Sequence, residues 1–380
     1  MKALVPNFKI VMLGASGAGK TLYLASLHHK LSLLNPDLGF YINTDSKKAL
    51  ILNSYAAALS NPDAGWPAGT RSLRQWEFAC YVNSYTDKIK AFEFQYIDYA
   101  GGTLTDFDES DSNSSQHDQL FASIQDANIL LALLDGEKLI DFMADNDSEK
   151  LHRFMSHDLP TILFQMRHAK PNVPVHFVVS KWDMVSSVGG FTIADIRNRL
   201  LSNSMIRNFL SFREDINNSI VRLIPISAIG LNKASYQRDQ QSGRVLTVRE
   251  TDEIDPYNVT VPLSYVLSDS IRSAVQALEA KKQSMRGLQR FFFSVRSIFK
   301  NPLIEILPPG FEWIVKVSAF TAGVIDHQST HRFSKFFSGE IGNINKQQDA
   351  LKYMLDICSK TTLKFEDNHP GTILTITKTM

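Results

Sequence analysis

Residues 14–21 read Gly14-Ala15-Ser16-Gly17-Ala18-Gly19-Lys20-Thr21, and they stand between an apolar run, 10–13, and a helix-like run, 22–34. This is the phosphate-binding pattern G-x-x-x-x-G-K-[ST]. Its glycines let successive backbone N–H groups point at phosphate oxygens, and the helix start adds positive partial charge. Lys20 can reach the β and γ phosphates, and Thr21 can hold Mg²⁺. The stretch predicts nucleoside triphosphate binding; the alternative is a glycine turn that binds nothing.

Composition limits the class of protein. The chain has 380 residues, 44% of them hydrophobic, which suffices for a full α/β domain with about 100 residues to spare. A formal net charge of +1 gives no electrostatic case for nucleic acid as a partner. Cys80 and Cys358 lack metal-like spacing and predict a reducing compartment. With no room for a signal sequence and no run of about 18 apolar residues, we expect a cytoplasmic protein.

The hydrophobic pattern alternates strands and helices. Long apolar runs such as 129–134 suit strands buried on both faces, which predicts an α/β fold with a mostly parallel sheet covered by helices. Segments 75–82 and 91–97 are expected to form one antiparallel edge. Strands are predicted at 9–13, 75–82, 91–97, 127–134, 173–179 and 220–226, and helices at 22–34, 46–59, 149–167, 193–212 and 262–282.

Three further motifs directly follow expected strands. In sheets of this kind, ligands bind beyond the carboxyl ends of the strands. Asp98-Tyr99-Ala100-Gly101 follows 92–97, so that Asp98 can orient the Mg²⁺ shell through water and the Gly101 amide can approach a γ-phosphate. Taken alone, D-x-x-G is equally typical of an aspartate turn that closes a strand.

The other two motifs are suited to reading a base. Ser180-Lys181-Trp182-Asp183 follows the buried run 175–179. Asp183 can accept two hydrogen bonds from guanine N1 and N2, which adenine cannot supply, while the Lys181 stem can lie along the base. Downstream, Ser227 and Ala228 end the last expected strand, and a backbone N–H there can donate to guanine O6.

Together these motifs resemble those of the Ras-like and translation-factor-like P-loop GTPases, over residues 7–230. The resemblance implies a GTPase fold, guanine specificity, binding of GTP or GDP, and dependence on Mg²⁺. It also implies that 67–70 is the switch I segment, with Thr70 meeting Mg²⁺ and the γ-phosphate; a Pro/Gly turn before a strand is the alternative. The W-P-x-G-T form at 66–70 is similar to that of bacterial GTPases associated with conflict or defence systems.

Two positions depart from the family pattern. Ser180 stands where Asn or Thr is usual, and its shorter side chain predicts reduced guanine affinity. Gly102 stands where Ras-like enzymes place the water-orienting Gln, and glycine has no side chain to orient water. Intrinsic hydrolysis is therefore expected to be slow unless another group substitutes, such as Gln116, His117 or Gln119, which are otherwise solvated surface residues.

Residues 103–118 form the least globular stretch, with five acidic residues and no Lys or Arg. We expect a mobile loop that falls where switch II should lie. It either orders on GTP or partner binding or is a plain surface insertion.

The resemblance ends after residue 282, and we divide the chain into a GTPase domain, 1–282, and a small C-terminal α+β extension, 283–380. Segment 281–300 has six basic residues, no acidic ones and four phenylalanines. Such a segment can bind to the surface of an anionic membrane or to an acidic protein. The alternative is a connector helix whose phenylalanines pack against the GTPase domain. Further on, 347–359 is helix-like, and 362–365 and 372–377 predict a β-hairpin.

We expect, in sum, a slowly hydrolysing GTP switch in which Lys20, Thr70 and Gly101 serve the γ-phosphate and an effector or activating protein reads its state. The alternatives are a nucleotide-clamped interaction module with negligible hydrolysis, which Gly102 favours, and a P-loop ATPase, which Asp183 argues against.

Overall fold

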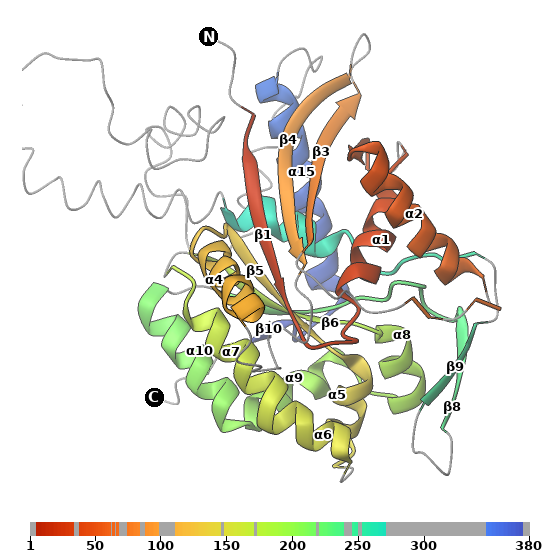
Figure 1. Ribbon diagram of the computed structural model, residues 1–380, viewed down its shortest axis with the longest axis vertical. Helices are drawn as coiled ribbons and strands as arrows, with labels where there is room; N and C mark the ends of the chain where they lie inside the picture. The colour runs from red at the N-terminus through yellow and green to blue at the C-terminus, as the bar shows by residue number, and fades with distance from the viewer. Residues whose placement is uncertain are drawn as a thin grey trace, which may run out of the picture.

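The structure is a computed structural model (Figure 1). It describes residues 5–33, 38–61, 63–64, 66–67, 74–83, 88–98, 111–145, 148–170, 173–217, 220–238, 245–249, 253–270 and 347–374.

A single large sheet organises the described residues. Its strands are β1 (Asn7–Leu13), β2 (Phe40–Asn43), β3 (Arg74–Asn83), β4 (Lys88–Asp98), β5 (Ile129–Leu134), β6 (Val175–Val179), β7 (Val221–Pro225) and β10 (Ile373–Leu374). They lie in the order β10-β7-β6-β5-β1-β4-β3-β2. The five strands from β7 to β4 are parallel, whereas β3 and β2 extend one edge antiparallel and β10 extends the other. The predicted α/β class, with its mostly parallel sheet and antiparallel β3–β4 edge, is confirmed.

Helices cover this sheet on both sides (Figure 1). Besides a helical segment at 261–270, they are α1 (Lys20–Leu31), α2 (Ser46–Ser60), α4 (Asp111–Gln125), α5 (Gly136–Met143), α6 (Glu149–Arg153), η1 (Phe154–Asp158), α7 (Leu159–Arg167), α8 (Trp182–Met184), η2 (Val185–Gly189), α9 (Ile193–Ser202), α10 (Ser204–Asn217) and α15 (Gln347–Asn368).

Strand β1 shows how the sheet separates two cores. Its side chains alternate between the faces, as strand geometry requires. Phe8, Ile10 and Met12 join a cluster with residues of α1, 261–270 and α15. Val11 and Leu13 join a second cluster with residues of α4, α5, α7, α9 and α10. All five side chains are fully buried, so β1 is fixed at the centre of the molecule and the loop that follows it has a rigid base.

The C-terminal region differs from the expected hairpin. Residues 362–365 are the last turns of α15, not a strand. Leu355, Cys358, Thr362 and Phe365 are all buried at spacings of three and four, so a helical face packs on the sheet and overrides the β-branched composition. Only β10 forms, and it pairs with β7 rather than with a hairpin partner. The helix α15 lies behind β3 and β4 in Figure 1.

The acidic stretch after Asp98 also differs from expectation. Residues 111–118, predicted to be part of a mobile loop, form the first turns of α4. Leu120 and Ile124, one turn apart, are buried in the second core cluster, and they anchor a helix that extends back through the polar residues. His117 and Gln119 therefore lie on a helix and not in a loop, as does the backbone of residue 116.

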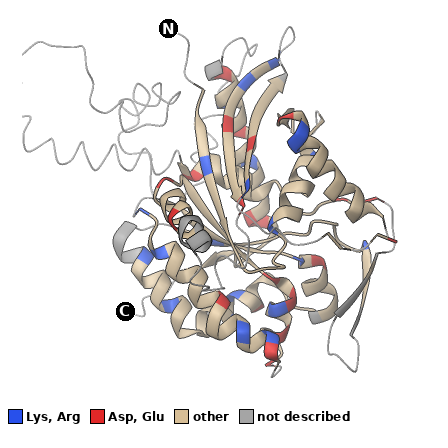
Figure 2. Cartoon of the chain, in the orientation of Figure 1, with Lys and Arg blue, Asp and Glu red and all other residues tan. Residues whose placement is uncertain are grey.

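Several predictions fall outside the described residues. These are Thr70, Gly101, Gly102, residues 103–110, the basic segment 281–300 and the boundary between 282 and 283. In the part of the chain that is described, no helix is both long and apolar enough to cross a membrane. Both Lys and Arg and Asp and Glu occur on the described helices around the sheet (Figure 2).

Candidate functional site

The predicted motifs converge at one edge of the sheet. Because β1, β4, β5, β6 and β7 run parallel, their carboxyl ends meet there. The chain leaves these strands at Gly14, Asp98, Asp135, Ser180 and Ile226. The loop after β1 and the loop after β6 are neighbours, since a Cβ built on Gly19 would lie 3.9 Å from Cβ of Ser180. The two sequence motifs therefore lie next to each other at this edge.

Glycines shape the loop between β1 and α1. Gly17 and Gly19 have left-handed φ angles of 80° and 86°, which residues with a Cβ rarely adopt. Gly14 passes so close to β5 that an added Cβ would lie 2.9 Å from the carbonyl oxygen of Leu133. The first turn of α1 begins directly after Gly19, at Lys20. Residues 14–19 are therefore fixed against the sheet at one end and the helix at the other.

The Lys20 side chain folds back over this loop. Its Nζ donates to the carbonyl oxygens of Gly14 at 2.8 Å and Ala15 at 3.2 Å, and the residue is 6% exposed. Burial lowers the pKa of Lys20 to about 8, although the nearby carboxylate of Asp98 opposes the shift. A buried cation held by neutral carbonyls gains more from an anionic oxygen, so this ammonium is ready to turn to a phosphate.

Thr21 and Asp98 meet beneath the loop. The Thr21 hydroxyl donates to Oδ2 of Asp98 at 2.7 Å, and Asp98 is fully buried at the end of β4. A hydroxyl and a carboxylate beside a phosphate loop fit Mg²⁺, which prefers hard oxygen ligands and completes its shell with water and substrate phosphate. No group of three or more His, Cys, Asp or Glu side chains that could hold a metal ion occurs in the described ranges.

The loop after β6 is held by ion pairs of Lys181. Lys181 has a left-handed φ of 53°, and its Nζ lies 2.8 Å from Oδ1 of Asp135 and 3.8 Å from Oε2 of Glu137. Burial opposes the charged form, yet these carboxylates hold the pKa of Lys181 above its usual value. Asp135 also caps α5 by accepting from the amide of Glu137 at 3.1 Å. The Lys181 side chain is thus tied to the loop after β5.

The Asp183 carboxylate lies in this loop and is 6% exposed. Burial raises its pKa, while hydrogen bonds from Ser227 and Tyr236 act in the opposite direction. The Tyr236 hydroxyl donates to Oδ2 of Asp183. A buried carboxylate that needs hydrogen-bond donors can distinguish guanine, which offers two, from adenine.

The loop after β7 completes the site. The Ser227 amide donates to the carbonyl of Tyr257 at 3.1 Å, so the neighbouring Ala228 amide is the better candidate donor to a base. The hydroxyl of Ser26, on α1, donates to the Ala228 carbonyl at 2.9 Å. The phosphate-side helix therefore holds the base-side loop in place.

Sequence reasoning missed three residues of this site. Asp135 and Gly136 follow a buried run as an Asp-Gly pair, a signal that could have marked another strand end. Gly136 permits a close contact, since an added Cβ would lie 2.3 Å from the Ser180 carbonyl oxygen. Tyr236 carries no local signal, because only the tertiary fold brings it to Asp183.

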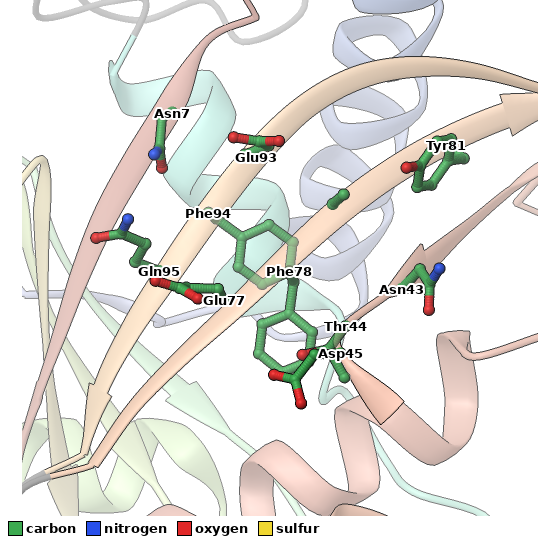
Figure 3. Close-up of a pocket in the computed structure, with 11 residues that line it drawn as sticks. Asn7, Asn43, Thr44, Asp45, Glu77, Phe78, Tyr81, Glu93, Phe94 and Gln95 are labelled. Carbon is green, nitrogen blue, oxygen red and sulfur yellow. The ribbon is translucent and has the colours of Figure 1, made fainter. Parts of the chain in front are cut away.

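An open hollow of about 370 Å³ lies elsewhere, on the outer half of the sheet (Figure 3). Asn7, Glu77, Glu93 and Gln95 are among the side chains around it. Asn7 begins β1, and the phosphate loop follows its last residue, so the two lie about 20 Å apart at 3.3 Å per residue. The hollow is separate from the convergent motifs.

Comparisons with known proteins find distant structural likeness only. No protein-family model matches the chain, and no curated protein matches its sequence. Among solved structures, the signal recognition particle receptor SRb-GTP/SRX complex from Chaetomium thermophilum is 19% identical, with a TM-score of 0.34 over 60% of this chain and 92% of that chain. Sup35 complexed with GDP is 12% identical, with a TM-score of 0.32 over 63% of this chain and 41% of that chain.

Proposed function

We propose that this protein binds GTP with Mg²⁺, hydrolyses it slowly and alternates between GTP and GDP states to control a partner. The observation that carries the proposal is the meeting of the phosphate motif, the Thr21–Asp98 pair and the Asp183 carboxylate at one sheet edge. Each part serves a different portion of a guanine nucleotide, and no part is explained as core packing.

The phosphate side has an ammonium, backbone amides and a hydroxyl. Lys20 leaves the carbonyls of Gly14 and Ala15 to pair with β and γ phosphate oxygens. Backbone amides of the loop donate to the same phosphates, apart from that of Ala18, which donates to the Ala15 carbonyl at 3.2 Å. Thr21 holds Mg²⁺, and Asp98 orients its water shell. The ion, when bound, neutralises charge on the phosphates.

The base side reads guanine. Asp183 accepts from N1 and N2 of the base, Ala228 donates its amide to O6, and the Lys181 stem lies along the ring. Adenine presents an acceptor at N1, so it offers Asp183 no donor there and cannot make the pair of hydrogen bonds that guanine makes. This difference favours GTP over ATP.

Hydrolysis is in-line attack by water on the γ-phosphate, with Lys20 and the loop amides stabilising the developing charge. Thr70 and Gly101 serve the same phosphate in this proposal. Gly102 has no side chain to position the water, so turnover without a partner falls in the range of about 10⁻⁴ to 10⁻² s⁻¹ known for incomplete switch GTPases.

The test combines base competition with single-turnover hydrolysis. Purified protein is loaded with a fluorescent guanine nucleotide and challenged with GTP, GDP, ATP and XTP, with Mg²⁺ and with chelator. We expect displacement by GTP and GDP, dependence on Mg²⁺ and slow phosphate release. Displacement by ATP as effective as by GTP would overturn the guanine assignment.

The glycine at position 102 favours a second candidate, a nucleotide-clamped interaction module. In that case bound GTP persists for many hours, and candidate activating proteins do not speed its loss. Measurable single-turnover hydrolysis would exclude this candidate.

A further inference from the structure

A small hairpin stands apart from the main sheet. Its strands, β8 (Ala234–Arg238) and β9 (Val245–Arg249), pair antiparallel with each other and form a sheet of their own. Figure 1 shows the hairpin projecting beside α8, the short helix that contains Asp183. A two-stranded ribbon is marginally stable alone, so its position depends on the contacts that it makes with the body of the protein.

The hairpin is joined to the loop after β7 through a closed neck. Ser227 and Tyr257 exchange backbone hydrogen bonds of 3.1 and 2.9 Å, and the Asp255 amide donates to the Ile229 carbonyl at 3.0 Å. Gly230 has a φ of 106°, and an added Cβ would lie 2.3 Å from the Asp255 carbonyl oxygen. The neck therefore keeps both ends of the hairpin at the Ser227–Ala228 loop, while the strands beyond it have no partner strand in the main sheet.

One contact ties the hairpin to the predicted base reader. Tyr236, on β8, packs its partly buried ring on the second core cluster and donates its hydroxyl to Oδ2 of Asp183. Guanine N1 and N2 would donate to the two oxygens of that same carboxylate. An acceptor that is 6% exposed has little room for the phenol and the base edge together.

We propose that Tyr236 acts as a gate on base recognition: its hydroxyl occupies the Asp183 carboxylate, and the β8–β9 hairpin must shift before a guanine base can enter or leave. This inference rests on the proposed function, because it requires Asp183 to read guanine. The Tyr236 hydroxyl donates to the buried carboxylate until the base takes its place. Because guanine binding breaks the Tyr236–Asp183 hydrogen bond, the free energy of that bond reduces the affinity for guanine.

The electrostatics fit such an exchange. Burial alone raises the pKa of Asp183, and the donated hydroxyls of Ser227 and Tyr236 favour the charged form. Burial and the Asp183 carboxylate both raise the pKa of Tyr236, so the phenol stays protonated and remains a donor. Burial outweighs these hydrogen bonds and leaves the pKa of Asp183 raised, so the donated hydroxyls offset part of the cost of the ionised form that guanine requires.

Replacing the hydroxyl tests the gate. We expect Tyr236→Phe to speed association of a fluorescent GDP analogue in stopped-flow mixing and to tighten its binding by about tenfold, which corresponds to 1.4 kcal/mol. Tyr257→Phe is the matched control, because it removes another tyrosine hydroxyl at the neck, one that lies 2.6 Å from Nε2 of His369, without touching Asp183. The control is expected to bind like the wild type.

The outcomes separate the gate from the function on which it rests. If the wild type prefers guanine nucleotides but Tyr236→Phe binds them no faster, or more weakly, the gate is overturned and the function stands. A weaker variant would make Tyr236 a positioning residue for the carboxylate. If the wild type binds no guanine nucleotide, both proposals fall. Melting curves of the two variants show whether either change has unfolded the protein.

Discussion

The Thr21 hydroxyl donates a 2.7 Å hydrogen bond to the buried carboxylate of Asp98, 77 residues away in the sequence. Thr21 is placed by the first turn of α1 and Asp98 by the end of β4, so the contact links the phosphate loop to the neighbouring parallel strand. In the proposed function the two residues share one role, which is to hold Mg²⁺ and its water shell.

Removing the Thr21 hydroxyl should weaken the dependence of GTP binding on Mg²⁺. We expect Thr21→Ala to lower Mg²⁺-dependent GTP affinity by about 1.5–3 kcal/mol, the size of a hydrogen bond or ligand contact that involves charge. Titration of GTP with and without Mg²⁺ measures this. Thr21→Ser keeps the hydroxyl and should retain most of the dependence on Mg²⁺. Equal dependence in Thr21→Ala and the wild type would remove Thr21 from the ion site.

Loss of the Lys20 ammonium should be costly on the phosphate side. We expect Lys20→Ala to lose several kcal/mol of triphosphate binding or transition-state stabilisation, because phosphate oxygens lose their cationic partner. Calorimetry and single-turnover assays measure the two contributions. Unchanged affinity and turnover in this variant would contradict the phosphate-loop assignment itself.

Triphosphate affinity should fall in alkaline solution. Lys20 has a pKa of about 8 as it lies against the loop carbonyls, and phosphate oxygens would raise it. Binding is therefore coupled to proton uptake once the pH exceeds about 8, and affinity declines as pH rises further, whereas near pH 7 the ammonium is already present. Calorimetry at pH 8.5 in buffers of different ionisation heat detects the uptake. Lys20→Arg stays charged throughout and should show none; equal uptake in both would exclude Lys20 as its source.

Replacing one carboxylate oxygen of Asp183 by an amide nitrogen should change the base specificity. We expect Asp183→Asn to prefer xanthine over guanine nucleotides, because the amide offers a donor where guanine also donates and xanthine has an acceptor. Competition of GTP against XTP measures the exchange. Wild type and variant proteins that bind GTP equally well would show that Asp183 does not read the base.

A buried ionic network should support the fold rather than the chemistry. The Arg222 guanidinium pairs with Asp269 at 2.9 Å and Glu366 at 3.1 Å, and it lies 4.2 Å from the Tyr265 ring centroid. These contacts join β7 to the 261–270 helix and to α15. His176 belongs to the same network: its Nδ1 accepts from the Arg222 amide, so its Nε2 donates to Asp269 at 2.8 Å.

Breaking this network should therefore destabilise the protein. We expect Asp269→Ala to lower the free energy of unfolding by about 3–5 kcal/mol, because it leaves a buried guanidinium without that carboxylate. Glu77→Ala removes an exposed partner of Lys48 and is expected to cost no more than about 1 kcal/mol. Urea denaturation compares the free energies of unfolding of the two variants. If Asp269→Ala does not fold, Asp269→Asn is measured in its place. If both variants lost a similar free energy of unfolding, the buried network would not be a major source of stability.

The strand, glycine turn and helix at residues 7–31 could be predicted from sequence because their patterns are local. A strand, a glycine-rich turn, a lysine and a helix follow one another within about 30 residues, and each has its own pattern. The sequence also predicted that the remaining motifs lie at one edge of the sheet, because the carboxyl ends of parallel strands meet at one edge. Helix α2 was predicted to within a residue from its periodicity, and the structure shows that Asp45 caps its start by accepting from the amides of Lys47 and Lys48.

Long-range packing decided what the patterns could not. Residues 362–365 have strand-like composition, yet they continue α15, because burial of Phe365 against Tyr265 favours a helical face. Residues 111–118 look too polar to order, yet they are part of α4, which the burial of Leu120 stabilises further along. Local composition gives no information about the surface that a distant element will offer.

The sequence by itself determined the α/β class, the glycine-rich turn after β1 and the residue types beyond each strand, because these depend on neighbours in the chain. Only the tertiary structure joined Lys181 to Asp135 and Tyr236 to Asp183. Those pairs are 46 and 53 positions apart and follow no periodicity. They form because buried charges and polar groups must be satisfied wherever the fold places them, and that requirement acts in space and not along the chain.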